Sequence, residues 1–218
     1  GGKTLSIGIL GGASGGYIKA ALDRMELPNE MVLSSEQTRT NIKIVDPVLK
    51  TNTDINEPGG RVSRETLLAV WEKLTAVVKP GDTVVFAGKN PPGMADELLA
   101  AWIRRLKALD VRVCVDTVGE PMRLALAEGP DIIKPNKSEL SEIVGADLIS
   151  DRQVLDAAKA LVDKGVGMAV VSMGSNGAIF VTKDRVLRGR CPKVSVVSTV
   201  GAGDAMMAAL AGSSQIWG

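Results

Sequence analysis

The sequence STVGAGDAMM, residues 198–207, predicts a tight turn and a helix start within a single short stretch. β-Branched residues over 194–197 predict a strand just before it, and the apolar run after Asp204 is typical of a helix. A strand, a glycine turn and a helix start leave backbone N–H groups free at the positive end of a helix dipole. The turn Gly201-Ala202-Gly203 is therefore a candidate site for a phosphate or another anion.

Asp204 stands at the rim of this turn and has two interpretations. Its negative charge would compete with a bound anion, so a carboxylate here is useful if it takes a proton from a hydroxyl that attacks a phosphate. The alternative is that Asp204 caps a helix whose preceding turn needs glycine. The local sequence leaves both interpretations open.

The composition excludes several classes of function. The chain has 218 residues, 45% of them apolar, which is enough for one large domain or two small ones. Its 26 basic and 25 acidic residues give no electrostatic case for a nucleic-acid partner. The absence of histidine excludes Ser-His-Asp hydrolases, histidine-ligated metals and histidine proton shuttles. Because no apolar run approaches the ~20 residues that span a bilayer, we expect no membrane partner.

The cysteines and the two ends of the chain indicate its setting. Cys114 and Cys191 are too few and too far apart for a zinc site or a disulfide framework, so we expect buried free thiols in a reducing cytoplasm. The chain begins GGKT, without methionine or a signal pattern, and stops after one helix at residue 218. We therefore expect segments to be missing at both ends.

Short apolar strands alternate with helices along the chain, which predicts an α/β fold with a mostly parallel sheet covered on both faces. No linker is evident, so a single domain over 1–218 is expected. The predicted strands cover 5–10, 40–45, 51–55, 83–87, 111–115, 131–134, 168–172, 178–181 and 194–197, and the predicted helices cover 16–25, 63–79, 96–109, 137–144 and 151–164.

Polar and glycine-rich clusters follow five of the predicted strands, at 88–93, 116–117, 134–136, 173–177 and 201–204. Ligands of such sheets gather at the carboxyl ends of the strands. Five clusters at one edge therefore predict a ligand site there.

Two further features each allow a functional and a structural interpretation. Asn136 and Glu139 would share one face of a helix start, where they could organise magnesium through waters or form a capping box. Arg39 opens a predicted strand, where it could hold a phosphate by two hydrogen bonds or stand as a surface arginine.

Taken in order, these residues resemble the ribokinase-like sugar kinases, and within them the phosphofructokinase B branch. The resemblance runs from about residue 8 to residue 212 and is closest to 1-phosphofructokinases and tagatose-6-phosphate kinases. It rests on five stretches in family order: 38–41 (TRTN), 56–59 (NEPG), 134–139 (KPNxxE), 172–177 (SxGxxG) and 198–204 (STVGAGD). It implies a three-layer αβα sandwich and ATP-dependent phosphorylation of a phosphosugar hydroxyl with Mg²⁺.

The resemblance also implies a role for each matching residue. Asp204 would be the general base, and Gly201, Ala202 and Gly203 would form the anion hole for the transferring phosphoryl group. Asn136 and Glu139 would organise magnesium. The residues expected to line ATP are Lys134, Ser172, Gly174 and Gly177, and Arg39 would hold the phosphate already on the sugar.

Three departures from the family pattern limit what the resemblance implies. Family members extend further at both ends, where they carry a sugar-binding aspartate and helices around the adenine. Lys89 stands where the family usually has serine, and it would either add a phosphate contact or block the sugar.

The resemblance also implies a partner. A small β lid near 38–58 would make the contact of a homodimer.

The expected acceptor is fructose 1-phosphate, giving fructose 1,6-bisphosphate. Tagatose 6-phosphate and fructose 6-phosphate are alternative acceptors. An alternative of another class is a shortened nucleotide-binding module without turnover.

Overall fold

The computed structural model describes residues 3–213 except 47, 50 and 193–199. Contacts within the chain define two compact units. The N-terminal unit contains residues 1–78 and 91–94, and the C-terminal unit contains residues 79–90 and 95–218. The single domain over 1–218 stays a prediction. The expected strand at 194–197 lies outside the described residues.

The N-terminal unit combines a β-α-β element with a hairpin. Strands β1 (Ser6–Gly11) and β2 (Asn29–Ser34) pair in parallel, joined by helix α1 (Gly12–Arg24), and helix α2 (Arg64–Val77) packs against both strands. Helix α2 begins after Ser63, whose side chain accepts a hydrogen bond from Thr66 N at 3.2 Å. Strands β3 (Asn41–Asp46) and β4 (Thr51–Asn56) form a separate antiparallel hairpin.

The C-terminal unit is built on a six-stranded sheet in the order β10-β9-β8-β7-β6-β5. The four strands of this sheet that come first in the sequence are parallel: β5 (Thr83–Ala87), β6 (Arg112–Asp116), β7 (Ile132–Ile133) and β8 (Met168–Ser172). Strands β9 (Ala178–Thr182) and β10 (Val186–Gly189) continue the sheet in antiparallel pairing. The helices are α3 (Asp96–Lys107), α4 (Gly119–Leu126), α5 (Lys137–Val144), α6 (Asp151–Asp163), the 3₁₀ turn η1 (Gly174–Asn176) and α7 (Ala202–Ser213).

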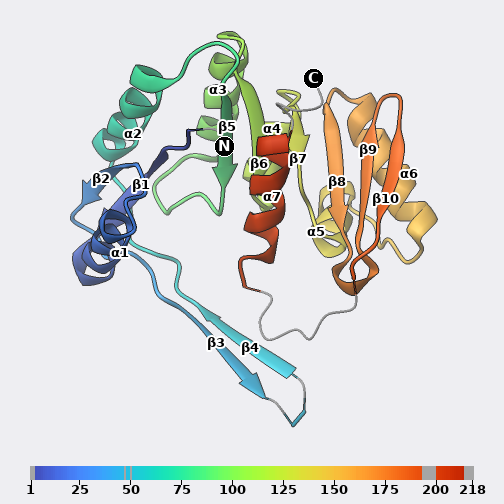
Figure 1. Cartoon of the computed structure of the whole chain (residues 1–218), viewed down its shortest axis with the longest axis horizontal. Helices are drawn as coiled ribbons and strands as arrows, with labels where there is room; N and C mark the ends of the chain where they lie inside the picture. The colour runs from blue at the N-terminus through green and yellow to red at the C-terminus, as the bar shows by residue number, and fades with distance from the viewer. Residues whose placement is uncertain (1–2, 47, 50, 193–199, 214–218) are drawn as a thin grey trace. The chain divides into compact units, whose positions relative to one another are not determined.

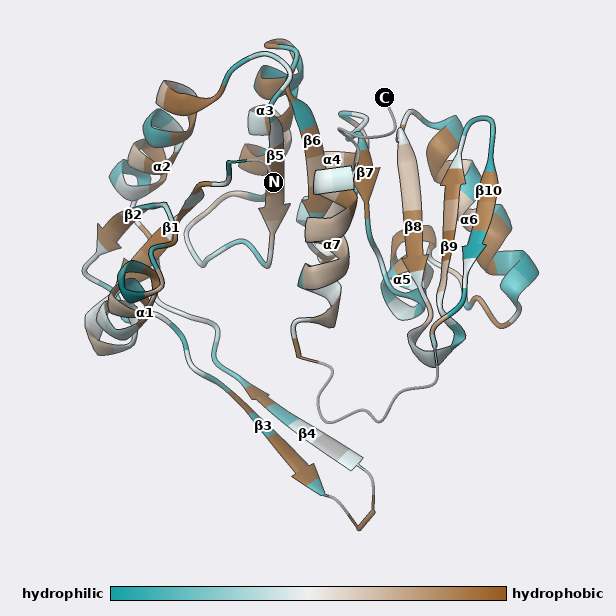
Figure 2. Ribbon diagram, in the orientation of Figure 1, coloured by the Kyte–Doolittle hydropathy of each residue, from teal (hydrophilic) through white to brown (hydrophobic). Residues whose placement is uncertain are grey.

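Helices cover both faces of this sheet, as Figure 1 shows, with α7 on the near face and α3 to α6 on the far face. Met207 of α7 is buried in a cluster with Cys114, Ile132, Val170 and Ala178. Side chains alternate across a strand, so the neighbours of Cys114 on β6 point to the opposite face. Buried residues of the far-face helices include Ile103, Leu106, Met122, Leu140 and Val154. Hydrophobic residues dominate β7, β8 and α7 in Figure 2. The expected three-layer αβα fold is confirmed.

The sequence pattern does not predict three of the observed elements. Strand β2, helix α4 and strand β10 were not expected, and α1 begins at Gly12 instead of residue 16. Helix α4 contains a glycine and a proline in its first turn, which ordinarily indicate a turn. Among the described residues, no helix has both the length and the apolar character needed to cross a membrane. A cytoplasmic location stays a prediction.

The expectation of two buried thiols is correct for Cys114 and wrong for Cys191. Cys114 lies in β6 beneath α7, and burial raises the pKa of its thiol to about 12. Cys191 is exposed because it follows the end of β10 instead of lying within a strand.

We predict that an aromatic disulfide reagent at about pH 8 labels only Cys191 in the folded chain, because the thiolate is the nucleophile and Cys114 stays protonated and covered. Denaturant should make both thiols react, and a Cys191→Ser variant should lose the fast phase. Fast reaction of two thiols in the folded chain would contradict the burial of Cys114.

Candidate active site

The turn that precedes α7 has the expected geometry in its described part. Gly201 has a φ of 78°, in the left-handed region that favours glycine, and its carbonyl accepts a hydrogen bond from Ala205 N at 2.9 Å. Helix α7 starts at Ala202, so Asp204 lies in its first turn. Gly201, Ala202, Gly203 and Asp204 are all exposed. The turn therefore presents backbone N–H groups and one carboxylate to solvent.

This position does not suit the N-cap interpretation of Asp204. The N-cap residue directly precedes the helix, and that position belongs to Gly201, which has no side chain. A carboxylate in the first turn still interacts favourably with the helix dipole. The role of Asp204 as a base stays a prediction.

Lys134 lies beneath the same turn. The residue is only 5% exposed, and its ammonium pairs with Asp116 Oδ2 at 3.2 Å. A Cβ atom added to Gly203 would lie 3.2 Å from Lys134 Nζ. The ends of β6 and β7 and the start of α7 thus meet at one point, as the clustering of polar residues after the strands predicts.

Asn136 and Glu139 form a capping box at the start of α5. Asn136 Oδ1 accepts a hydrogen bond from Glu139 N at 2.9 Å, and Glu139 Oε2 accepts one from Asn136 N at 2.8 Å. The structural interpretation of this pair is therefore confirmed, and the magnesium role stays a prediction. In the described part of the chain, no group of three or more acidic or cysteine side chains could hold a metal ion.

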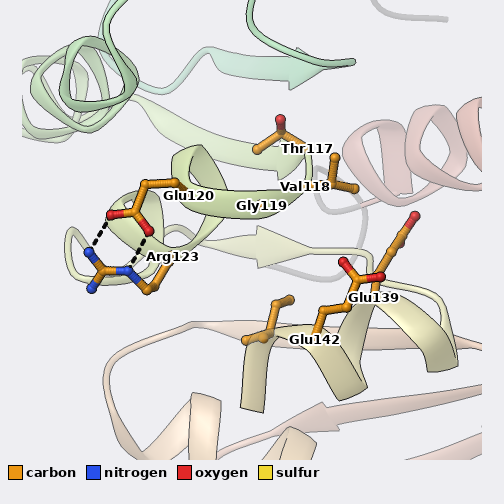
Figure 3. Close-up of a pocket in the computed structure, with 8 residues that line it drawn as sticks. Thr117, Val118, Gly119, Glu120, Arg123, Glu139 and Glu142 are labelled. Atoms are coloured by element: carbon orange, nitrogen blue, oxygen red, sulfur yellow. Dashed lines mark hydrogen bonds and ion pairs between the residues drawn. The ribbon is translucent and has the colours of Figure 1, made fainter. Parts of the chain in front are cut away.

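A cavity of about 180 Å³ opens between α4 and α5. Its lining residues are Thr117, Val118, Gly119, Glu120, Arg123, Glu139, Glu142 and Ile143. Figure 3 shows Glu139 and Glu142 on one side and the Glu120–Arg123 ion pair on the other. The Arg123 guanidinium lowers the pKa of Glu120 through this hydrogen-bonded pair. Sequence reasoning missed this cavity because it missed α4.

The glycine-rich stretch after β8 turns the chain into β9. Met173 N donates to the carbonyl of Gly177 at 2.8 Å, and Gly177 N donates to the carbonyl of Gly174 at 3.0 Å. A Cβ atom at Gly177 would lie 2.0 Å from the carbonyl oxygen of Gly189, so only glycine fits there. Ser172 forms a parallel bridge with Asn136, which brings this turn beside the start of α5. This stretch therefore turns a hairpin between β8 and β9, and the nucleotide role of Ser172, Gly174 and Gly177 stays a prediction.

Arg39 and Lys89 belong to different units. Exposed Arg39 lies before β3, and the motif around it meets the 56–59 motif, because Thr40 N donates to Glu57 Oε2 at 2.8 Å. Lys89 is exposed after β5, next to Gly88, whose φ is 92°. Gly88 N donates to the carbonyl of Asp116 at 2.9 Å, which ties the Lys89 loop to the end of β6.

A helix start over a buried ammonium, at the carboxyl edge of a mostly parallel sheet, is an arrangement in which α/β proteins commonly bind anionic ligands. The profile of the pfkB family carbohydrate kinases matches residues 1–213. The chain belongs to this family of kinases.

Individual relatives agree with this assignment. The chain is 34% identical over 215 residues to the 1-phosphofructokinase of Xanthomonas campestris, covering 97% of this chain and 68% of that protein. It is 41% identical over 174 residues to the 1-phosphofructokinase of Rhodobacter capsulatus, covering 79% of this chain and 55% of that protein. It thus spans between about half and two thirds of their lengths.

A 6-phosphofructokinase is also similar. The chain is 31% identical over 212 residues to the ATP-dependent 6-phosphofructokinase isozyme 2 of Escherichia coli, covering 96% of this chain and 68% of that protein. The crystal structure of Escherichia coli phosphofructokinase-2 with substrates and products matches with a TM-score of 0.92 at 30% identity, over 98% of this chain and 70% of that chain.

Proposed function

We propose that this chain carries out the ATP-dependent phosphorylation of fructose 1-phosphate to fructose 1,6-bisphosphate. The observation that carries the proposal is the Gly201–Asp204 turn, which presents N–H groups and a carboxylate at the start of α7. The names of the Xanthomonas and Rhodobacter relatives support this acceptor. The Escherichia coli relative supports fructose 6-phosphate as the alternative acceptor.

The chemistry at the turn would proceed in one displacement. Asp204 would accept the proton of the attacking sugar hydroxyl while the new O–P bond forms and the bond to the ADP oxygen breaks. The N–H groups of Gly201, Ala202 and Gly203 would stabilise the charge on the transferring phosphoryl group. No histidine is needed, because the carboxylate serves as the base.

The remaining proposed roles concern binding. Four residues lie at or just beyond the ends of the neighbouring strands β7 and β8, an arrangement that suits a nucleotide lying along the carboxyl edge: Lys134, Ser172, Gly174 and Gly177. In the N-terminal unit, Arg39 would hold the sugar phosphate by a two-bond fork. In the C-terminal unit, Lys89 would contact a phosphate of the substrate through its ammonium.

Asn136 and Glu139 have the donor atoms that Mg²⁺ prefers, an amide oxygen and a carboxylate. Each has one oxygen in the capping box, and the second carboxylate oxygen of Glu139 is not used by the box. Two oxygen ligands suit an ion that keeps several waters and binds mainly to substrate phosphates. When bound, Mg²⁺ would neutralise charge on the phosphate oxygens of ATP.

We predict that Asp204→Asn lowers kcat by about a hundredfold or more, because a general base contributes roughly 10²–10⁴-fold. The assay measures ADP release with fructose 1-phosphate, fructose 6-phosphate and tagatose 6-phosphate in turn. Asp184→Asn, at an exposed aspartate between β9 and β10, is the control and should keep full activity. No turnover with any of the three sugars would refute the proposed function, and an active Asp204→Asn variant would refute the base.

We predict that Glu139→Gln separates the metal role from the cap. Glutamine maintains a capping box, as Gln153 does in the Ser150–Gln153 box of this chain, so the unfolding free energy should change by less than about 0.5 kcal/mol. Loss of the charge should raise the Mg²⁺ concentration for half-maximal activity about tenfold. An unchanged Mg²⁺ dependence would refute the metal role of Glu139 and leave only its role in the capping box.

The hairpin β3–β4 supports the homodimer. Ile42, Ile44 and Ile55 are each more than half exposed on one face, with Ile42 opposite Ile55 in register. The Lys43–Asp54 ion pair, at 2.8 Å, lies on the other face. A two-stranded hairpin gains stability when its apolar face is covered, and a second copy would cover it. Escherichia coli phosphofructokinase-2 has been solved in a tetrameric form.

We predict that Ile44→Lys shifts the chain from dimer to monomer in sedimentation velocity, because it places a charge in the covered face. Ile149→Lys, at an 81% exposed isoleucine before α6, is the matched control and should leave the dimer intact. A monomeric parent chain would refute the homodimer.

A further inference from the structure

We infer that Asp116 is a positioning residue, which holds the Lys134 ammonium against the first turn of α7, and that position 203 is glycine because this ammonium occupies the adjacent space. The inference rests on the proposed function, since it assigns the Lys134 ammonium to the phosphoryl group held at that turn. The proposed reaction itself requires no contact between Asp116 and the substrates.

Strand register explains why the two side chains meet. Strands β6 and β7 are parallel, with Cys114 beside Ile132 and Val115 beside Ile133. Cys114 and Ile132 face α7, where both pack in the Met207 cluster. Side chains two positions along a strand share a face, so Asp116 and Lys134 also point to the α7 side. The apolar pair under Met207 is thus followed by an ion pair.

The same spacing places this ion pair under the helix start. Gly203 lies four residues before Met207, which is about 6 Å along the helix axis. Asp116 lies two residues beyond Cys114, which is about 6.6 Å along a strand. The distance from Met207 to Gly203 along the helix is thus similar to the distance from Cys114 to Asp116 along the strand. The first turn of α7 therefore lies beside the ion pair, and a Cβ added to Gly203 would lie 3.2 Å from Lys134 Nζ.

Burial gives the pair its importance. The side chains of Lys134 and Asp116 are 7% and 18% exposed. A buried ammonium without a partner is strongly unfavourable, so its counterion fixes where it can lie. Asp116 therefore keeps the ammonium at the helix start when no phosphate is present. Because Asp116 repels a phosphate, it acts on the reaction through Lys134 and not by direct contact.

The close approach of the ammonium explains why position 203 is glycine. Its φ lies outside the left-handed region, so its backbone does not require glycine, and alanine is the better helix former. The conflict is one of space, since an alanine Cβ would lie 3.2 Å from Nζ and 3.7 Å from Cε of Lys134. The ammonium cannot retreat freely, because Asp116 holds it. Gly212, in the same helix, has no neighbour within 4 Å of an added Cβ.

The ammonium and the α7 N–H groups then act on the same ligand atoms. The helix start alone offers partial positive charge, and a full charge beside Gly203 strengthens it. The same transferring phosphoryl group would contact both. Loss of Lys134 should therefore lower kcat more than it raises the KM for the sugar.

A double-mutant cycle tests the positioning role of Asp116. Lys134→Met should lower kcat about a hundredfold, the scale of one lost transition-state donor, and Asp116→Asn should lower it about tenfold. If Asp116 acts through Lys134, the double variant should be no slower than Lys134→Met. Fully multiplied effects, or an Asp116→Asn variant with the parent kcat, would overturn the inference. Asp156→Asn, which breaks the exposed pair with Arg152, is the control.

Substitution of Gly203 gives a second test, which distinguishes positioning of the Lys134 ammonium from a purely structural role of this glycine. Gly203→Ala should lower kcat about tenfold without lowering the melting temperature, and Gly212→Ala should leave kcat unchanged. In the Lys134→Met background, where the ammonium is gone, Gly203→Ala should cost no further activity. A Gly203→Ala variant with the parent kcat would overturn the spatial argument.

An additional measurement distinguishes this inference from the proposed function. If the parent chain phosphorylates none of the three sugars, the proposed function fails, and the cycle is repeated on the rise in melting temperature caused by Mg²⁺-ATP. Asp116→Asn and Lys134→Met should each reduce that rise, and the double variant no more than Lys134→Met. A parent chain without any such rise, or fully additive losses, would overturn the inference as well.

Discussion

The burial of Met207 between α7 and the sheet is the contact on which the site depends. Met207 packs on Cys114, Ile132, Val170 and Ala178, which come from four neighbouring strands. Met206, Leu210 and Ala211 of the same helix also pack against this cluster, so removal of apolar surface from water holds α7 on the sheet. Once α7 is fixed, its first turn lies over the ends of β6 and β7, and the polar residues that follow those strands become its neighbours.

The site combines structural and chemical tasks in the same residues. Asn136 and Glu139 close a capping box that starts α5, and in the proposed function the carboxylate oxygen of Glu139 that the box does not use would help to organise magnesium waters. Gly177 permits the hairpin after β8 because nothing larger fits against the Gly189 carbonyl. In both places the need of the fold and the proposed need of the ligand select the same residue type. For Asn136 and Glu139 this is why the sequence alone left the capping box and the magnesium role open.

Local chemistry made part of this arrangement predictable. The turn at Gly201 and the helix after it follow from glycine and an apolar run, and the strands around Val113 and Val170 follow from β-branched residues. The Asp116–Lys134 pair could not be predicted, because it depends on the register between two strands separated by the unexpected helix α4. The exposed position of Cys191 was missed since its neighbours resemble a strand, although β10 ends before it.

The crowding at Gly203 has a consequence for how this sequence can change over time. Replacing Lys134 alone would leave the Asp116 carboxylate buried without its counterion, and adding a Cβ at Gly203 alone would require the ammonium to shift by a few tenths of an ångström. These three positions, distant along the chain, therefore constrain one another's substitutions. Among related sequences, we expect the residues at positions 116, 134 and 203 to be retained together or to change together.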